Sequence, residues 1–177
     1  MLRMSRFFVL AGGLMACQPA QETPSGSAER TADRHEAVLE VVERKNDRIE
    51  TLYAEGEVDS LVAMFAEDVW QMPPNMAPLV GREALRGFWS DAMQWGDWTF
   101  ELRTEDLVVS DSIAVERGTY AMSVEADPEA PIPSMRDQGN YVVLWRLDPD
   151  GEWRIVWDAP VSELPPGGTG EGAAGGE

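Results

Sequence analysis

Carboxylates and tyrosines are the side chains of this 177-residue chain that could move protons in a buried site. The sequence holds one histidine, His35, and one cysteine, Cys17, both towards the N-terminus. A serine triad needs a histidine base, and zinc, copper and haem sites need histidine or cysteine ligands. The sequence therefore predicts no metal and no cofactor, and leaves any chemistry to acids and tyrosines.

Glu116 is the strongest candidate for an acid–base group. Side chains alternate between the two faces of a strand, which places Glu116 on an otherwise apolar face. The other residues of that face are Ala114, Gly118, Tyr120, Met122 and Val124. A carboxylate among apolar neighbours has a raised pKa and can exchange protons near neutrality. The alternative is a solvated ion pair of Glu116 with Arg103, Arg117 or Arg154.

Asp158 and Tyr120 complete the predicted catalytic set. Asp158 ends the last predicted strand, where strict alternation puts it opposite Trp153, Ile155 and Trp157. It therefore either faces outward or is turned inward by a bulge. The hydroxyl of Tyr120 could donate a hydrogen bond to a developing oxyanion.

The aromatic residues indicate an apolar pocket. The chain contains seven tryptophans, nine methionines and three tyrosines, a composition that favours a small hydrophobic, partly aromatic ligand. The predicted ligand-binding residues are Tyr53, Trp70, Met72, Trp89, Trp98, Tyr141 and Trp157. The alternative is that aromatic residues at strand spacing form the core or a dimer interface.

The charge of the chain excludes some partners. The net charge is −18, so phosphate backbones and anionic lipid headgroups are repelled. We therefore expect no nucleic-acid binding and no electrostatic attachment to a membrane. An acidic surface is typical of a soluble exported domain.

The N-terminus resembles the signal of a bacterial lipoprotein. Arg3 and Arg6 precede a short apolar run, and Leu14 to Cys17 resembles a lipobox. The sequence thus predicts a signal peptide over residues 1–16 and lipidation of Cys17, and Gln18 favours the outer membrane. The alternative is ordinary cleavage nearby, which would leave an incidental thiol.

Helical periodicity comes first and strand periodicity later, which indicates an α+β domain over residues 33–163. A capping box at Asp33 and Glu36 would begin a helix that ends at Gly56. Its apolar face is Val38, Val42, Ile49, Leu52 and Tyr53, interrupted by Lys45. Further helices are predicted near residues 58–65 and after Gly81, followed by strands over 98–103, 113–125, 141–147 and 153–158. Residues 17–32 are predicted to form a flexible lipid-anchored linker and residues 164–177 a glycine-rich disordered tail.

This order of elements resembles the SnoaL-like, ketosteroid-isomerase-like group of the nuclear transport factor 2-like superfamily. The stretches that carry the likeness are residues 53–57, 65–68, 72–74, 81–85, 114–120, 139–145 and 153–158. The resemblance implies a cone-shaped, curved antiparallel sheet wrapped around three N-terminal helices, with a pocket between them. Family members include isomerases, dehydratases and non-catalytic binders, and many form homodimers. We therefore expect binding of a small hydrophobic molecule with carboxylate-driven isomerase or dehydratase chemistry, or alternatively a non-catalytic dimeric module tethered to the membrane.

Overall fold

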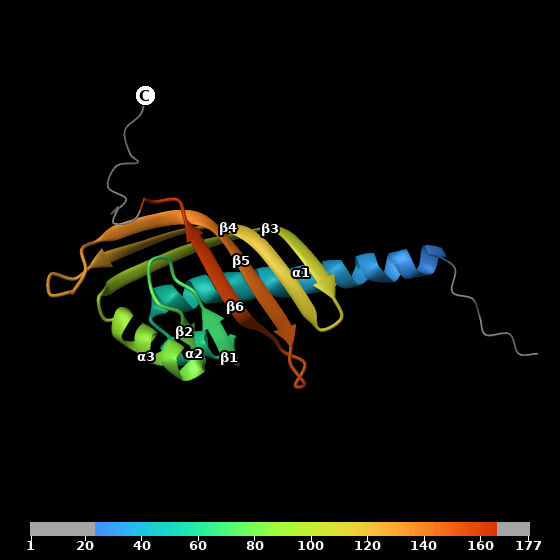
Figure 1. Cartoon of the computed structure of the whole chain (residues 1–177), viewed down its shortest axis with the longest axis horizontal. Coiled ribbons are helices and arrows are strands. Elements are labelled where there is room, and N and C mark those ends of the chain that lie inside the picture. The colour runs from blue at the N-terminus through green and yellow to red at the C-terminus, as the bar shows by residue number, and fades with distance from the viewer. Residues whose placement is uncertain (1–23, 166–177) are drawn as a thin grey trace, which may run out of the picture.

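A computed structural model describes residues 24–165 and shows a six-stranded sheet curved around a long N-terminal helix (Figure 1). The elements are α1 (Pro24–Glu55), α2 (Val58–Val62), β1 (Phe65–Gln71), β2 (Leu79–Val80), α3 (Arg82–Ala92), β3 (Gly96–Ser110), β4 (Ile113–Ala126), β5 (Met135–Leu147) and β6 (Trp153–Ser162). Helix α1 packs mainly on β3, whereas α3 packs on β1 and β2. The α+β class and the curved sheet around the helices are confirmed.

The sheet is mixed, whereas the sequence predicted an antiparallel one. Its strand order is β2-β1-β6-β5-β4-β3, and β1 pairs in parallel with β6. The chain leaves β1, passes through α3 to the far edge of the sheet, and returns through three hairpin-connected strands. The last strand, β6, therefore arrives beside β1 and runs in the same direction.

Helix α1 begins at Pro24, before the predicted start at Asp33. The prediction of a flexible linker is therefore wrong for residues 24–32. Proline is tolerated in the first helical turn, and Ala28, Glu29 and Arg30 are good helix formers. The packed part of α1 supplies a nucleus, so extension towards the N-terminus adds hydrogen bonds at little cost.

The predicted features at both ends of the chain fall largely outside the described residues. The signal peptide, Cys17 and residues 18–23 lie there, as do residues 166–177 of the predicted tail. Among the described helices, none has both the length and the apolar character needed to cross a membrane.

Polar side chains of α1 bind the free edge of β3. The backbone N–H of Leu102 donates to Glu50 Oε1 at 2.6 Å, and a ring nitrogen of His35 lies 2.9 Å from the carbonyl oxygen of Leu107. Strand β3 ends the sheet, so these groups have no neighbouring strand to pair with. His35 is thus part of the contact between α1 and the β3 edge.

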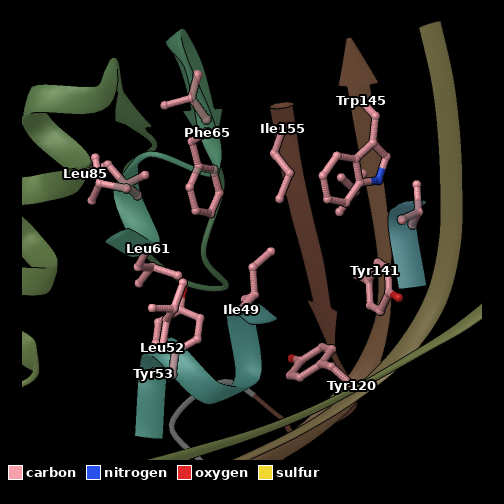
Figure 2. Close-up of a cluster of buried hydrophobic side chains, with 14 of the residues drawn as sticks. Ile49, Leu52, Tyr53, Leu61, Phe65, Leu85, Tyr120, Tyr141, Trp145 and Ile155 are labelled. Carbon is pink, nitrogen blue, oxygen red and sulfur yellow. The ribbon is translucent and has the colours of Figure 1, made fainter. Parts of the chain in front are cut away.

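The hydrophobic core fills the space between the helices and the inner face of the sheet (Figure 2). Complete burial of a large apolar side chain contributes about 1.5–3 kcal/mol. The side chains with at most 3% exposure include Leu52, Leu61, Phe65, Leu85, Trp145 and Ile155. Asn46, not Lys45, continues the inward face of α1, because Asn46 is 6% exposed and Lys45 forms an ion pair with Glu152.

A bulge in β3 decides which of its residues face inward. The register shifts between Thr104 and Asp106, so Glu105 is the extra residue. The shift changes the parity of the strand, and both Thr104 and Leu107 point to the inner side. This bulge is what brings the Thr104 hydroxyl to the site described next.

Candidate functional site

A cavity of about 80 Å³ lies between α1 and the inner face of the sheet. Figure 2 shows Ile49, Tyr120 and Tyr141 in this region. Its polar lining residues are Asn46, Tyr53, Tyr120, Tyr141 and Asp158. Its apolar lining residues are Ile49, Phe65, Phe100, Leu102, Val143, Ile155 and Pro160. Pockets for drug-sized ligands measure about 300–1,000 Å³, so this cavity fits a much smaller molecule.

Glu116 is fully buried behind this lining and accepts four hydrogen bonds. Its Oε1 accepts from Asn46 Nδ2 at 2.7 Å, from Thr104 Oγ1 at 2.7 Å and from the Tyr141 hydroxyl at 2.6 Å. Its Oε2 accepts from the indole N–H of Trp145 at 2.8 Å. The prediction that Glu116 faces inward is confirmed, and the alternative of a solvated ion pair is wrong.

The four donors make Glu116 a poor catalytic base. Three of them converge on one oxygen, and every donor comes from a buried or partly buried residue. A substrate would have to displace one of these hydrogen bonds to reach the carboxylate. Glu116 therefore orients Tyr141 and Asn46 at the cavity wall and supplies negative charge behind them.

Gly118 makes this arrangement possible. The residue lies between Glu116 and Tyr120 on the inner face of β4 and pairs with Tyr141 on β5. A Cβ atom at position 118 would overlap the ring and hydroxyl of Tyr141 and the carbonyl oxygen of Arg103. The missing side chain thus lets the Tyr141 ring cross β4 and reach Glu116.

Asp158 lines the cavity because β6 contains a bulge. Trp145 pairs with Ile155 and the preceding Leu144 pairs with Trp157, so Val156 is the extra residue. Ile155 and Asp158 therefore both face inward, while Trp157 is 53% exposed. Of the two orientations that the sequence left open for Asp158, the bulge selects the inward one.

Gln71 holds the carboxylate of Asp158. Its Nε2 donates to Asp158 Oδ2 at 2.9 Å, and its Oε1 accepts from the indole N–H of Trp89 at 3.0 Å. The indole thus fixes the orientation of the Gln71 amide. Asp158 keeps acceptor capacity free on the cavity side, unlike Glu116, and can accept a proton from a ligand.

The pKa of Asp158 is suited to proton transfer near neutrality. Burial raises this pKa to about 6; the hydrogen bond from Gln71 lowers it in part, and the negative charge of Glu116 adds the smallest contribution, a further increase. Burial also raises the pKa of Tyr53 and of Tyr141, and the nearby carboxylates reinforce both effects. The two tyrosines therefore remain neutral hydrogen-bond donors throughout the physiological range.

Tyr120 lines the cavity but already has a partner. Its hydroxyl donates to Asp137 Oδ2 at 2.8 Å, and Ser162 Oγ donates to Asp137 Oδ1 at 2.7 Å. Burial first, and then Asp137, raises the pKa of Tyr120. The predicted role of Tyr120 as a donor to an oxyanion would therefore require it to leave Asp137.

The predicted ligand-binding residues divide into three groups. Tyr53 and Tyr141 line the cavity. The prediction is wrong for Trp70 and Trp157, which are 46% and 53% exposed on the outer face of the sheet because of strand alternation and the β6 bulge. Three others, Trp89, Trp98 and Met72, do not line the cavity. The indoles of Trp89 and Trp98 are instead buried, with their N–H groups bound to Gln71 and to the carbonyl oxygen of Ala92.

Three polar residues of the site were missed from the sequence. Asn46 continues the 3.6-residue period through Val42 and Ile49, and that spacing could have identified it. Gln71 and Thr104 carry no comparable signal, because their inward positions depend on strand pairing and on a bulge.

No metal site is evident between residues 24 and 165, where no group of three or more acidic, histidine or cysteine side chains could hold an ion. The acidic turn after β5 forms ion pairs within the chain: Asp148 and Asp150 both pair with Arg154. The cavity therefore offers acids, tyrosines and amides as its chemical groups.

A family model for the SnoaL-like domain matches residues 46–156. The match includes Glu116 and ends two residues before Asp158. The chain belongs to the SnoaL-like domain family. No curated protein matches this SnoaL-like chain in sequence.

Solved structures share the fold of this SnoaL-like domain. A putative scytalone dehydratase from Novosphingobium aromaticivorans is 17% identical, with a TM-score of 0.65 over 75% of this chain and 89% of the other. A ketosteroid isomerase-like protein from Erwinia carotovora atroseptica is 17% identical, with a TM-score of 0.58 over 72% and 97%. A nuclear transport factor 2-like protein from Salmonella enterica is 17% identical, with a TM-score of 0.59 over 80% and 99%. At this identity the likeness shows the fold alone.

Proposed function

We propose that this SnoaL-like domain binds a small, largely apolar molecule in the 80 Å³ cavity and moves a proton on it, with Asp158 as the general base. The observation that carries the proposal is a cavity-lining carboxylate with a pKa of about 6 and one side-chain hydrogen bond, from Gln71. Tyr53 and Tyr141 line the same cavity and place neutral hydroxyl groups near the carboxylate.

The chemistry that fits these groups is an isomerisation or a dehydration. Asp158 would take a proton from carbon, and the neutral hydroxyl of Tyr53 would stabilise the negative charge that develops on a neighbouring oxygen, since the hydroxyl groups of Tyr120 and Tyr141 already donate to Asp137 and Glu116. Proteins with the same fold carry the names scytalone dehydratase and ketosteroid isomerase-like, which is consistent with proton transfer but does not name a substrate.

Hydrogen exchange tests the proposal and does not require the product to be identified. Ligand that copurifies with the full chain is identified by mass spectrometry and incubated with fresh protein in D₂O. The wild type is expected to introduce deuterium, Asp158→Asn to lose this activity, and Glu101→Gln, which removes an exposed charge on β3, to retain it. Equal exchange by wild type and Asp158→Asn would exclude Asp158 as the base.

A second candidate is a dimeric binding or scaffold module, favoured by the outer face of the sheet. Six apolar residues follow one another as register partners across all six strands, an arrangement that we call the outer stripe. The outer stripe consists of Val80, Trp70, Trp157, Leu144, Val115 and Val108. We propose that two copies pair through it, because a two-fold axis brings the same apolar patch of each copy together.

Sedimentation of the full chain in a non-denaturing detergent tests this pairing. Wild type is expected to sediment as a dimer and Trp157→Ser as a monomer, since Trp157 is 53% exposed near the middle of the outer stripe. A matched control is Val161→Ser, which removes an exposed apolar residue of β6 from outside the outer stripe. A wild-type monomer at all concentrations would refute the pairing.

We also propose that Cys17 anchors the domain in the bacterial envelope, with the outer membrane as the expected location. The support is the position of Cys17 directly behind a short apolar run that follows Arg3 and Arg6. Cys17→Ala should move the protein from the membrane fraction to the soluble fraction. Membrane fractionation that does not change in Cys17→Ala would contradict the anchor.

A further inference from the structure

The cavity contains negative charge without a positive partner. Its lining includes the Asp158 carboxylate and no lysine, arginine or histidine. Glu116 lies directly behind the Asn46 and Tyr141 side chains, and its four hydrogen-bond donors are all neutral. Within residues 24–165, no ion pair joins either carboxylate to a basic side chain.

Two carboxylates without a cation are unusual in a protein interior. Removing a charge from water is costly unless an opposite charge or a full set of hydrogen bonds replaces the solvent. Glu116 has such a set, but Asp158 has one side-chain donor and lies in the field of Glu116. A ligand with a positive charge would supply what this end of the cavity lacks.

The remaining lining suits the apolar frame of such a ligand. Five aromatic side chains contribute to the wall, and organic ammonium groups pack favourably on aromatic rings. These five are Tyr53, Phe65, Phe100, Tyr120 and Tyr141. The net charge of −18 also raises the local concentration of cations around the protein and lowers that of anions.

We propose that the cavity binds a small organic cation, an ammonium group on a short apolar frame, with its positive charge directed to Asp158. The proposal deepens the proposed function and rests on one part of it, the binding of a small molecule in the cavity. It excludes carboxylates and phosphate esters as ligands.

A series of probes of matched shape tests the charge preference. The purified full chain is titrated at pH 8 with tert-butylammonium, tert-butanol and trimethylacetate, and binding is followed by NMR. We expect the ammonium to bind about tenfold to a hundredfold tighter than the alcohol, the range for a charge-assisted hydrogen bond, and the carboxylate not to bind. In Asp158→Asn the preference for the ammonium should disappear, whereas Glu101→Gln should retain it.

The preference should also depend on pH. The titratable groups that face Asp158 are Glu116 on β4, Tyr53 on α1 and Tyr141 on β5. Both tyrosines stay neutral, so protonation of Asp158 below about pH 6 should weaken binding of the ammonium and leave binding of the alcohol unchanged.

Three results would overturn the inference: equal binding of ammonium and alcohol, no binding of any probe, or an ammonium preference that persists in Asp158→Asn. None of them bears on proton transfer, which the deuterium exchange assay measures separately. Absence of deuterium exchange in the wild type, together with an intact ammonium preference, would instead refute the catalytic role of Asp158 and leave the cation site in place.

Discussion

Replacing Asp158 with asparagine should stabilise the folded domain at neutral pH. Asparagine has almost the same shape, and its Oδ1 can still accept the hydrogen bond from Gln71 Nε2 that Asp158 accepts at 2.9 Å. The substitution removes a charge that burial and Glu116 both disfavour. A carboxylate that serves a function in a cavity is expected to lower the stability of the fold.

The size of the gain follows from the pKa of Asp158. A rise from the ordinary value of 3.8 to about 6 corresponds to about 3 kcal/mol, at about 1.4 kcal/mol for each pH unit. This is an upper value, because Asp158 keeps some contact with solvent. For a domain of this size, 3 kcal/mol raises the melting temperature by roughly 9 °C.

The size of the effect changes with pH in a defined way. The folded state holds the Asp158 proton more tightly than the unfolded state, so wild-type folding is favoured by this group below pH 3.8 and loses that contribution as pH rises through about 6. The advantage of Asp158→Asn should therefore be small near pH 4 and complete above pH 7.

Urea unfolding of both proteins between pH 4.5 and pH 8 measures this difference, and Glu101→Gln controls for the loss of one exposed charge. The carboxylates that do not interact with Asp158 are the same in both proteins and cancel in the comparison. A variant that is less stable than wild type at pH 7, or whose difference from wild type does not change with pH, would refute the reasoning.

Three further substitutions test the Glu116 network. Gly118→Ala should destabilise the domain by about 1–3 kcal/mol in urea unfolding, because the added methyl group overlaps Tyr141 and the Arg103 carbonyl oxygen; wild-type stability would disprove this close approach. Glu116→Gln should cost roughly 1.5–3 kcal/mol, since its amide N–H would face the indole N–H of Trp145, and an unchanged midpoint would mean that the carboxylate is not required. Tyr141→Phe removes one donor to Glu116 and should cost about 1.5 kcal/mol with the melting curve still cooperative; a larger loss than in Glu116→Gln would contradict the ranking.

Local pattern was sufficient to predict much of the fold. The 3.6-residue period through Val38, Val42, Ile49 and Leu52 identified the inward face of α1, and each of these residues is buried. Alternation likewise placed Glu116 on the inner face of β4. The true start of α1 was not predictable from a capping pattern, because its N-terminal turns depend on extension from the packed segment.

The partners of the candidate site were not predictable in the same way. Gln71 and Asp158 are far apart in the sequence and meet because β1 pairs in parallel with β6. Trp157 was expected to contact the ligand, and the extra residue Val156 turns it outward. A one-residue change of register reverses every following side chain, and the sequence carries no clear mark of it.

The sequence by itself determined which chemical groups are available, because residue types and the short-range spacing of apolar residues can be read from it directly. It restricted proton transfer to acids and tyrosines and put Glu116 inside. The tertiary structure alone decided how the two carboxylates differ. Convergence of donors from α1, β3 and β5 occupies Glu116, whereas the β6 bulge leaves Asp158 exposed to the cavity with one side-chain donor. That difference arises from long-range strand pairing, which sets the environment of each carboxylate and hence its role.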